Sequence, residues 1–147
     1  MTQLRPILLV EDSLNDIELI LAALKRNNFA NEIVVARDGD EALDYFHGRG
    51  KFAGRAELPV VVLLDLKMPR KDGLEVLKEL KADPLLKVVP VVMLTSSREE
   101  ADLVRSYQLG ANAYIVKPVA FNDFVDAIRQ TGSFWAVVNE PPPMGKA

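Results

Sequence analysis

The chain has 147 residues and a formal net charge of −3 at pH 7, and 49% of its residues are apolar and 27% charged. This length and composition predict one globular domain with a sizeable core, and the acidic balance argues against a nucleic-acid-binding surface, which would be basic. The absence of cysteine excludes disulfides, thiol catalysis and zinc–thiolate sites. The apolar run near the start is too short for a signal peptide or a membrane span, so we expect a cytoplasmic protein.

The first 59 residues predict strands and helices in alternation. Residues 6–10 (PILLV) are typical of a buried strand, and residues 33–36 of a second, shorter strand. Apolar residues at helical spacing predict one helix over about 14–26 and another over 40–46. In the first helix the residues that recur at helical spacing are Leu14, Ile17, Leu21 and Leu24, and in the second the expected inward-facing residues are Ala42, Leu43 and Phe46. The link over 47–59 is rich in glycine and basic residues, and its length suggests a loop with a role of its own.

The middle of the chain contains the strand around which the rest is arranged. Residues 60–64 (VVVLL) form an unbroken apolar run, which is typical of a central strand buried on both faces. A helix then follows and ends at Asp83, and residues 90–94 (PVVML) predict a fourth strand. A further helix is expected over 98–109, with Gly110 as its C-cap. The inward-facing residues of the helix that ends at Asp83 are expected to be Leu74, Leu77 and Leu80.

The last third of the chain completes the pattern with a strand over 113–116 and a helix over 121–138. Five strands that alternate with five helices predict an α/β fold, a doubly wound five-stranded parallel sheet of order 2-1-3-4-5 with right-handed crossovers. We expect one domain over residues 1–139. Residues 140–147, with three consecutive prolines, predict a disordered tail.

Polar residues stand where four of the predicted strands end. Glu11 and Asp12 follow the first strand, Asp65 the third, Thr95 the fourth and Lys117 the fifth. In a doubly wound sheet these ends meet at one edge, beside the crevice where ligands bind. Three carboxylates there repel one another, which a hard divalent ion such as Mg²⁺ resolves.

These residue types suit phosphoryl chemistry. A carboxylate left partly free, such as Asp65, can act as a nucleophile towards phosphorus and form an aspartyl-phosphate. Mg²⁺, the Lys117 ammonium and the Thr95 hydroxyl would stabilise the charge on the transferring oxygens.

As a set, these residues resemble the receiver domains of two-component response regulators, the CheY-like family. The resemblance covers about residues 7–130. It rests on Glu11-Asp12, on Asp65 within LLDLKMPRKDG, and on Thr95-Ser96, Tyr114 and Lys117-Pro118.

The resemblance implies that Asp65 accepts a phosphoryl group from a histidine of a sensor kinase. It implies that Glu11, Asp12, Asp65 and the backbone carbonyl of Lys67 hold Mg²⁺, and that the domain takes part in its own Mg²⁺-dependent phosphotransfer and dephosphorylation. The domain would thus be a signalling protein and not a classical enzyme.

Further roles follow from the same resemblance. Thr95 would move towards the phosphoryl group and Tyr114 would swing inward behind it. The Lys117–Pro118 peptide bond would be cis. Lys67 and Ser97 occupy positions that tune the rate at which water removes the phosphoryl group.

The long link over 47–59 and the extension beyond the last helix resemble small stand-alone receivers that partner phytochrome-type histidine kinases. Phe134 and Trp135 are adjacent in the last helix and therefore point in different directions. We accordingly predict a homodimer through the last helix and its neighbours. With no output domain in the sequence, we expect the signal to pass through a partner protein, with neither nucleic acid nor membrane involved.

Each site residue also has an ordinary alternative role. Asp12 and Ser13 could cap the following helix, and Asp65 could be a turn carboxylate. Thr95 could cap another helix, Lys117 could be a solvated surface group, and Tyr114 could serve packing alone. Only their occurrence together favours the functional interpretation.

Two other function classes remain open. Haloacid dehalogenase-type phosphohydrolases share the arrangement, but they need an acid/base carboxylate two residues after the nucleophile, where this chain has Lys67. A phosphorylation-independent adaptor is the second alternative. His47, the only histidine, is interpreted as a surface residue and not as a phosphoacceptor. The glycines that follow it come after a helix and not a strand, which excludes a phosphate-binding loop.

Overall fold

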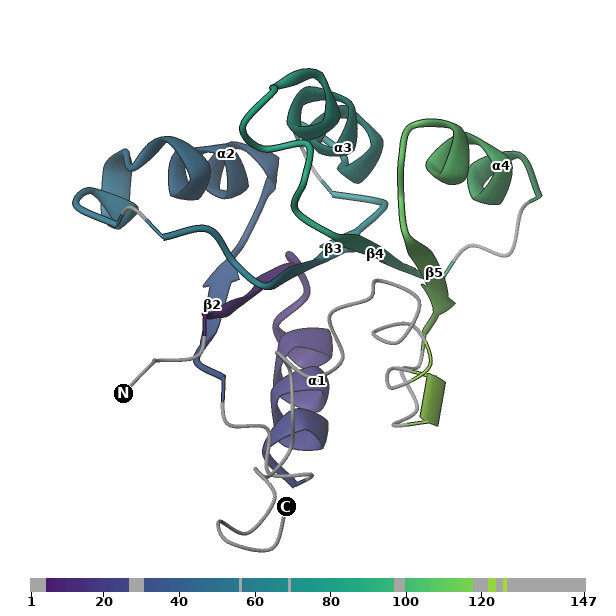
Figure 1. Cartoon of the computed structure of the whole chain (residues 1–147). Helices are drawn as coiled ribbons and strands as arrows, with labels where there is room; N and C mark the ends of the chain where they lie inside the picture. The colour runs from purple at the N-terminus through teal and green to yellow at the C-terminus, as the bar shows by residue number, and fades with distance from the viewer. Residues whose placement is uncertain are drawn as a thin grey trace, which may run out of the picture.

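The computed structural model describes residues 5–26, 31–55, 57–68, 70–96 and 100–117, together with Asn122, Asp123 and Asp126. Five parallel strands form one sheet of order β2-β1-β3-β4-β5 (Figure 1), which confirms the predicted fold class. The strands are β1 (Ile7–Val10), β2 (Ile33–Ala36), β3 (Val61–Asp65), β4 (Val91–Thr95) and β5 (Ala113–Val116).

Helices cover both faces of the sheet. They are α1 (Leu14–Arg26), α2 (Gly39–His47), α3 (Gly73–Ala82) and α4 (Glu100–Gln108), with a short 3₁₀ helix, η1 (Gly50–Phe52), after α2. In Figure 1, α1 lies below the sheet, and α2, α3 and α4 lie above it. Of the helix predicted over 121–138, the structure describes only three residues, which are helical. Most of that prediction, and the predicted tail over 140–147, therefore lie outside the described residues.

The two faces divide the core into two clusters, because successive side chains of a strand point to opposite sides of the sheet. Val62 and Leu64 of β3 belong to the cluster that contains the buried residues of α2 and α3. Leu63 belongs to the cluster that contains those of α1. All five residues of β3 are buried. Burial on both faces explains why this strand is an unbroken apolar run in the sequence.

The parallel register brings the C-terminal ends of the strands to one edge. Asp65 pairs with Leu94, and Thr95 pairs with Val116. These two pairs extend β3 and β4 one residue beyond the predicted ends at 64 and 94. Asp65 and Thr95 are therefore the last residues of their strands, and the backbone ladder fixes their orientation.

The link over 47–59 is packed onto the domain. Phe52 of η1 is buried and meets the Tyr45 ring edge to face, with 5.3 Å between ring centroids. The Tyr45 hydroxyl donates a hydrogen bond to the Glu57 carbonyl (3.2 Å). Tyr45 was not among the residues predicted to face inward, yet it is 2% exposed because η1 covers it.

The first of the apolar residues at helical spacing in α1 lies outside the core. Leu14 is 61% exposed, whereas Ile17, Ile20 and Leu24 are buried against the sheet. Leu14 is the first residue of α1 and precedes the turn that packs on the sheet. At the far end of α4, Gly110 has φ +105°, as expected of a glycine C-cap. Within the described residues, no helix is long and apolar enough to cross a bilayer.

Candidate functional site

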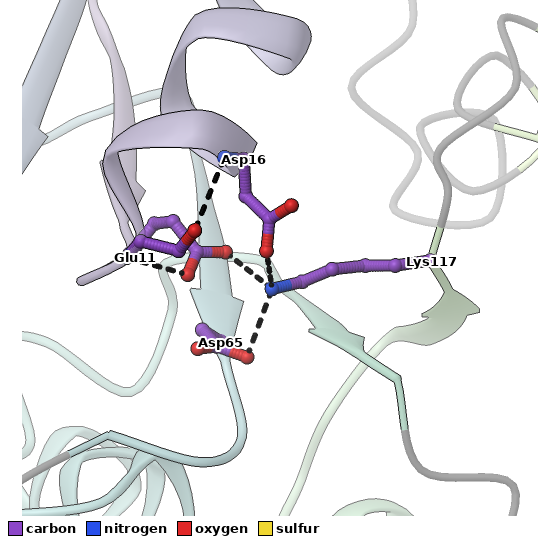
Figure 2. Close-up of polar contacts among 5 residues, drawn as sticks. Glu11, Asp16, Asp65 and Lys117 are labelled. Atoms are coloured by element: carbon purple, nitrogen blue, oxygen red, sulfur yellow. Dashed lines mark hydrogen bonds and ion pairs between the residues drawn. The ribbon is translucent and has the colours of Figure 1, made fainter.

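Three carboxylates surround the ammonium group of Lys117 (Figure 2). The Lys117 Nζ atom lies 2.6 Å from Glu11 Oε1, 2.9 Å from Asp16 Oδ2 and 3.5 Å from Asp65 Oδ1. Burial alone would lower the pKa of Lys117, but hydrogen bonds with Glu11 and Asp16 outweigh burial and raise this pKa. The ammonium is therefore a fixed positive charge at the edge of the sheet.

Glu11 and Ser13 are held by the turn that leads from β1 into α1. The Glu11 side chain is 1% exposed, and its Oε2 atom accepts a hydrogen bond from the Ser13 amide (3.2 Å). The Ser13 hydroxyl in turn accepts one from the Asp16 amide (3.2 Å) and so caps α1. Of the two predicted alternative caps, Ser13 fills that role, which leaves the Asp12 carboxylate available at the site.

Glu11, Asp12 and Asp65 form an acidic cluster, in which one carboxylate oxygen of each lies within 4.8 Å of the others. Oxygens on opposite sides of one divalent ion are about 4–5 Å apart, so these three residues fit such an ion. Without an ion, burial and then the charge of Glu11 raise the pKa of Asp65 to about 7, although Lys117 acts in the opposite direction. Holding these carboxylates together in their ionised forms thus costs free energy unless a cation binds between them.

Lys67, the predicted source of a backbone ligand, lies two residues after Asp65. Its side chain is 69% exposed, and its Nζ atom is 3.8 Å from Asp102 Oδ2. Any role in metal binding therefore falls to its backbone carbonyl. A phosphohydrolase of the haloacid dehalogenase type would need a carboxylate at this position, so the exposed Lys67 side chain argues against that alternative.

Thr95 and Lys117 are joined through the backbone. The Lys117 amide donates to the Thr95 carbonyl at 2.8 Å. Thr95 itself is fully buried at the end of β4. Two of the predicted features, the Lys117–Pro118 cis bond and the role of Ser97, involve residues outside the described part of the chain.

Tyr114, the predicted switch residue, is partly buried in β5. It packs against the core cluster that contains the buried residues of α2 and α3. It pairs in register with Met93, two residues before Thr95. A movement of Thr95 and a movement of Tyr114 would therefore involve the same pair of neighbouring strands.

The loop between β3 and α3 folds tightly against Asp65. The Gly73 amide donates to the Leu66 carbonyl at 2.9 Å. Asp72 caps α3 in a capping box with Glu75. Arg70 has φ +64°, an uncommon backbone conformation for a residue with a side chain. The loop thus fixes the backbone that carries the Asp65 carboxylate.

Two residues at the site were not among those predicted from the sequence. Asp16 contacts Lys117, and a carboxylate in the first turn of a helix is ordinarily interpreted as a partner of the helix dipole. Arg37 donates from Nη2 to the Asp12 carbonyl at 3.2 Å. Arg37 directly follows β2, so the rule that singled out the other strand ends could have found it. Asp16 carried no comparable signal.

This arrangement suits the attachment of a negatively charged group, such as a phosphoryl group, to a carboxylate. Asp65 is 4% exposed, belongs to the acidic cluster that fits a cation, and has an oxygen 3.5 Å from the Lys117 ammonium. Positive groups fixed around a nucleophilic carboxylate stabilise the charge of an incoming phosphoryl group.

Comparisons with known proteins identify the family of this chain. A family model for the response regulator receiver domain matches residues 7–129. The response regulator Rcp1 of Synechocystis sp. is 40% identical over 129 residues, which cover 88% of this chain and 87% of Rcp1.

Solved structures give the same result. The bacteriophytochrome response regulator AtBRR is 59% identical, with a TM-score of 0.85 over 95% of this chain and 100% of that chain. The Mn²⁺-bound form of Rcp1 is 39% identical, with a TM-score of 0.74 over 90% and 94% of the two chains. The phosphorylated cyanobacterial phytochrome response regulator RcpA is 43% identical, with a TM-score of 0.72 over 88% and 91%. The chain therefore belongs to the response regulator receiver domain family of two-component phosphorelay signalling, for which a histidine kinase is the implied partner.

Proposed function

We propose that Asp65 accepts a phosphoryl group from a phosphohistidine of a partner kinase. An Asp65 carboxylate oxygen forms the bond to phosphorus, while the phosphorus–nitrogen bond breaks and its electron pair stays on the imidazole. The observation that carries this proposal is the position of Asp65, which is a buried member of the acidic cluster and lies 3.5 Å from the Lys117 ammonium. Lys117 and the Thr95 hydroxyl then stabilise the phosphoryl oxygens.

Glu11, Asp12, Asp65 and the Lys67 carbonyl are the proposed ligands of Mg²⁺, which when bound supplies positive charge to the carboxylates and to the phosphoryl oxygens. The fit of the acidic cluster to a divalent ion supports this assignment. The Mn²⁺-bound structure of the relative Rcp1 also supports it. We further propose that the domain catalyses its own Mg²⁺-dependent phosphorylation and slow dephosphorylation, without turnover of other substrates.

The output is a change of conformation. The phosphoryl group on Asp65 carries about −1.5 to −2 charges, by analogy with other phosphorylated side chains, and it replaces the single negative charge of the ionised carboxylate. Thr95 responds by moving towards the new group, and Tyr114 moves inward behind it. A conformation that already exists at low population becomes the dominant one.

We propose a phytochrome-type sensor histidine kinase as the partner. AtBRR and RcpA, both described as response regulators of phytochrome or bacteriophytochrome, support this assignment through their identity of 59% and 43% with this chain. The cytoplasm, where ATP-dependent kinases act, is the proposed location.

Incubation with acetyl phosphate and Mg²⁺ tests the acceptor. We expect intact-mass measurements to show the addition of one phosphoryl group, and Asp65→Asn to abolish it. An unchanged mass of the wild-type protein would favour the phosphorylation-independent adaptor. Repeated turnover of small phosphate esters would favour a phosphohydrolase. Phosphotransfer from a panel of purified histidine kinases, with bacteriophytochromes among them, then identifies the partner.

We also propose a homodimer through the last predicted helix and its neighbour α4. The α4 helix exposes Leu103, Val104 and Tyr107, at 36%, 45% and 45%. Such neighbouring apolar side chains favour a protein interface. Phe134 and Trp135, which motivated the dimer prediction, lie outside the described residues. Sedimentation of a monomer at micromolar concentration, with and without phosphorylation, would reject the dimer.

A further inference from the structure

The carboxylate of Asp16 competes with Asp65 for the Lys117 ammonium. The Lys117 Nζ atom is 2.9 Å from Asp16 Oδ2 but 3.5 Å from Asp65 Oδ1. In Figure 2 the two carboxylates reach the ammonium from different sides, Asp16 from α1 and Asp65 from β3. The ammonium therefore lies closer to the helix than to the proposed acceptor.

An ammonium group has three N–H donors, and Lys117 already has three carboxylate partners. A phosphoryl group on Asp65 adds acceptor oxygens within reach of Nζ, and its charge of about −1.5 to −2 replaces the single negative charge of the carboxylate. Lys117 can donate short hydrogen bonds to these oxygens only if its contact with Glu11 or its contact with Asp16 lengthens.

Burial decides which contact lengthens. The Glu11 side chain is 1% exposed and is also held by the Ser13 amide, so water cannot replace its ammonium partner. The Asp16 side chain is 33% exposed, and water can solvate its carboxylate once Lys117 leaves. The Ser13 hydroxyl holds the Asp16 backbone amide (3.2 Å), so the side chain can move without unwinding the helix.

We propose that Asp16 is a positioning residue that holds Lys117 towards α1 until Asp65 is phosphorylated and then releases it. This inference rests on the proposed function of Asp65. It has two consequences. Asp16 weakens the binding of a phosphoryl group, because that group must draw the ammonium away from Asp16. Phosphorylation also frees a carboxylate in the first turn of α1, so the state of the site is transmitted to that helix.

Binding of beryllofluoride, a phosphoryl mimic that coordinates a carboxylate oxygen, tests this idea in the presence of Mg²⁺. Asp16→Asn should bind beryllofluoride about three- to tenfold more tightly than the wild-type protein, which is the gain expected when one partly exposed charge-assisted contact no longer competes for Lys117. Glu18→Gln, which removes an exposed charge from the same helix, is the matched control and should change affinity by less than about twofold. Tighter binding cannot result from a purely structural loss at Asp16, which would weaken the site.

The second measurement uses the wild-type protein and does not depend on the folding of a variant. The ¹³C resonance of the Asp16 carboxyl group should move towards that of a solvated aspartate when beryllofluoride binds. Unchanged or weaker binding by Asp16→Asn, or an Asp16 resonance that does not respond, would overturn the inference while leaving Asp65 as the acceptor. If the wild-type protein binds no beryllofluoride and takes no phosphoryl group, the proposed function fails and the inference fails with it.

Discussion

Gly73 and Asp65 are in direct backbone contact, since a Cβ atom on Gly73 would lie only 2.2 Å from the Asp65 carbonyl oxygen. The two residues are eight positions apart in the sequence, and the loop between β3 and α3 returns the chain to the base of Asp65. The spacing that holds the acceptor thus depends on the absence of a side chain at the first residue of α3.

Gly73→Ala should therefore displace the backbone of Asp65. We expect the free energy of unfolding to fall by about 2–4 kcal/mol, the cost of overpacking a buried site, and phosphorylation by acetyl phosphate to slow at least tenfold. Gly54→Ala is the control, because Gly54 has φ +91° but nothing within 4 Å of the place where a Cβ atom would lie. It should cost about 1 kcal/mol and leave phosphorylation unchanged. A Gly73→Ala variant with wild-type stability would show that the loop shifts to accommodate the added methyl group at no cost in free energy.

Arg37 supports the acidic cluster through the Asp12 carbonyl (3.2 Å). Arg37→Met should weaken Mg²⁺ binding about three- to tenfold, because the backbone that presents the Asp12 carboxylate loses its support. Isothermal titration with Mg²⁺ measures this affinity. Removal of a positive charge alone would instead strengthen the binding of a cation. Arg49→Met removes the exposed guanidinium that pairs with Asp44, and it should leave the affinity equal or slightly higher. If both variants bind Mg²⁺ more tightly, Arg37 acts only through its charge.

The stability of the metal-free protein should depend on pH through Asp65. Its pKa is raised to about 7 from a usual value of 3.8, so the folded protein binds a proton that the unfolded chain releases between these two pH values. The resulting stabilisation is complete below about pH 4 and is lost as the pH rises to about 7.

The unfolding free energy of the wild-type protein relative to Asp65→Asn should therefore fall across this range, by on the order of 4 kcal/mol. Urea unfolding in EDTA at several pH values measures the difference. Mg²⁺ should flatten the dependence near neutral pH, because the ion favours the ionised carboxylate. Parallel curves for the two proteins in EDTA would mean that Asp65 titrates normally.

Arg70 occupies a left-handed backbone conformation (φ +64°) in the loop that follows Asp65. Arg70→Gly should stabilise the protein by about 0.5–1 kcal/mol, because glycine adopts this conformation without a steric penalty. The ion pair of Arg70 with Asp38 spans 3.4 Å at the surface, so its loss should cost little. Arg70→Ala keeps the strain and loses the pair, and thermal unfolding should show no gain. Equal stability of the glycine and alanine variants would show that the backbone at position 70 is not strained.

The sequence alone determined the sheet and the residues at its edge. Unbroken apolar runs such as residues 60–64 arise because a central parallel strand is buried on both faces, and the polar residue that ends each run marks the edge where ligands bind. Strand order follows from the alternation of strands and helices with right-handed crossovers. These properties are local or periodic, so they can be read without knowledge of contacts.

Only the tertiary structure decided which side chains meet at that edge. Asp16 and Lys117 are 101 residues apart in the sequence, and no periodicity links them. The packing of η1 on Tyr45, which accounts for the long link, likewise joins segments whose own patterns do not predict the contact. The physical reason is that residue spacing encodes which face of an element is buried, whereas the partners of a buried charge depend on how neighbouring elements place their ends.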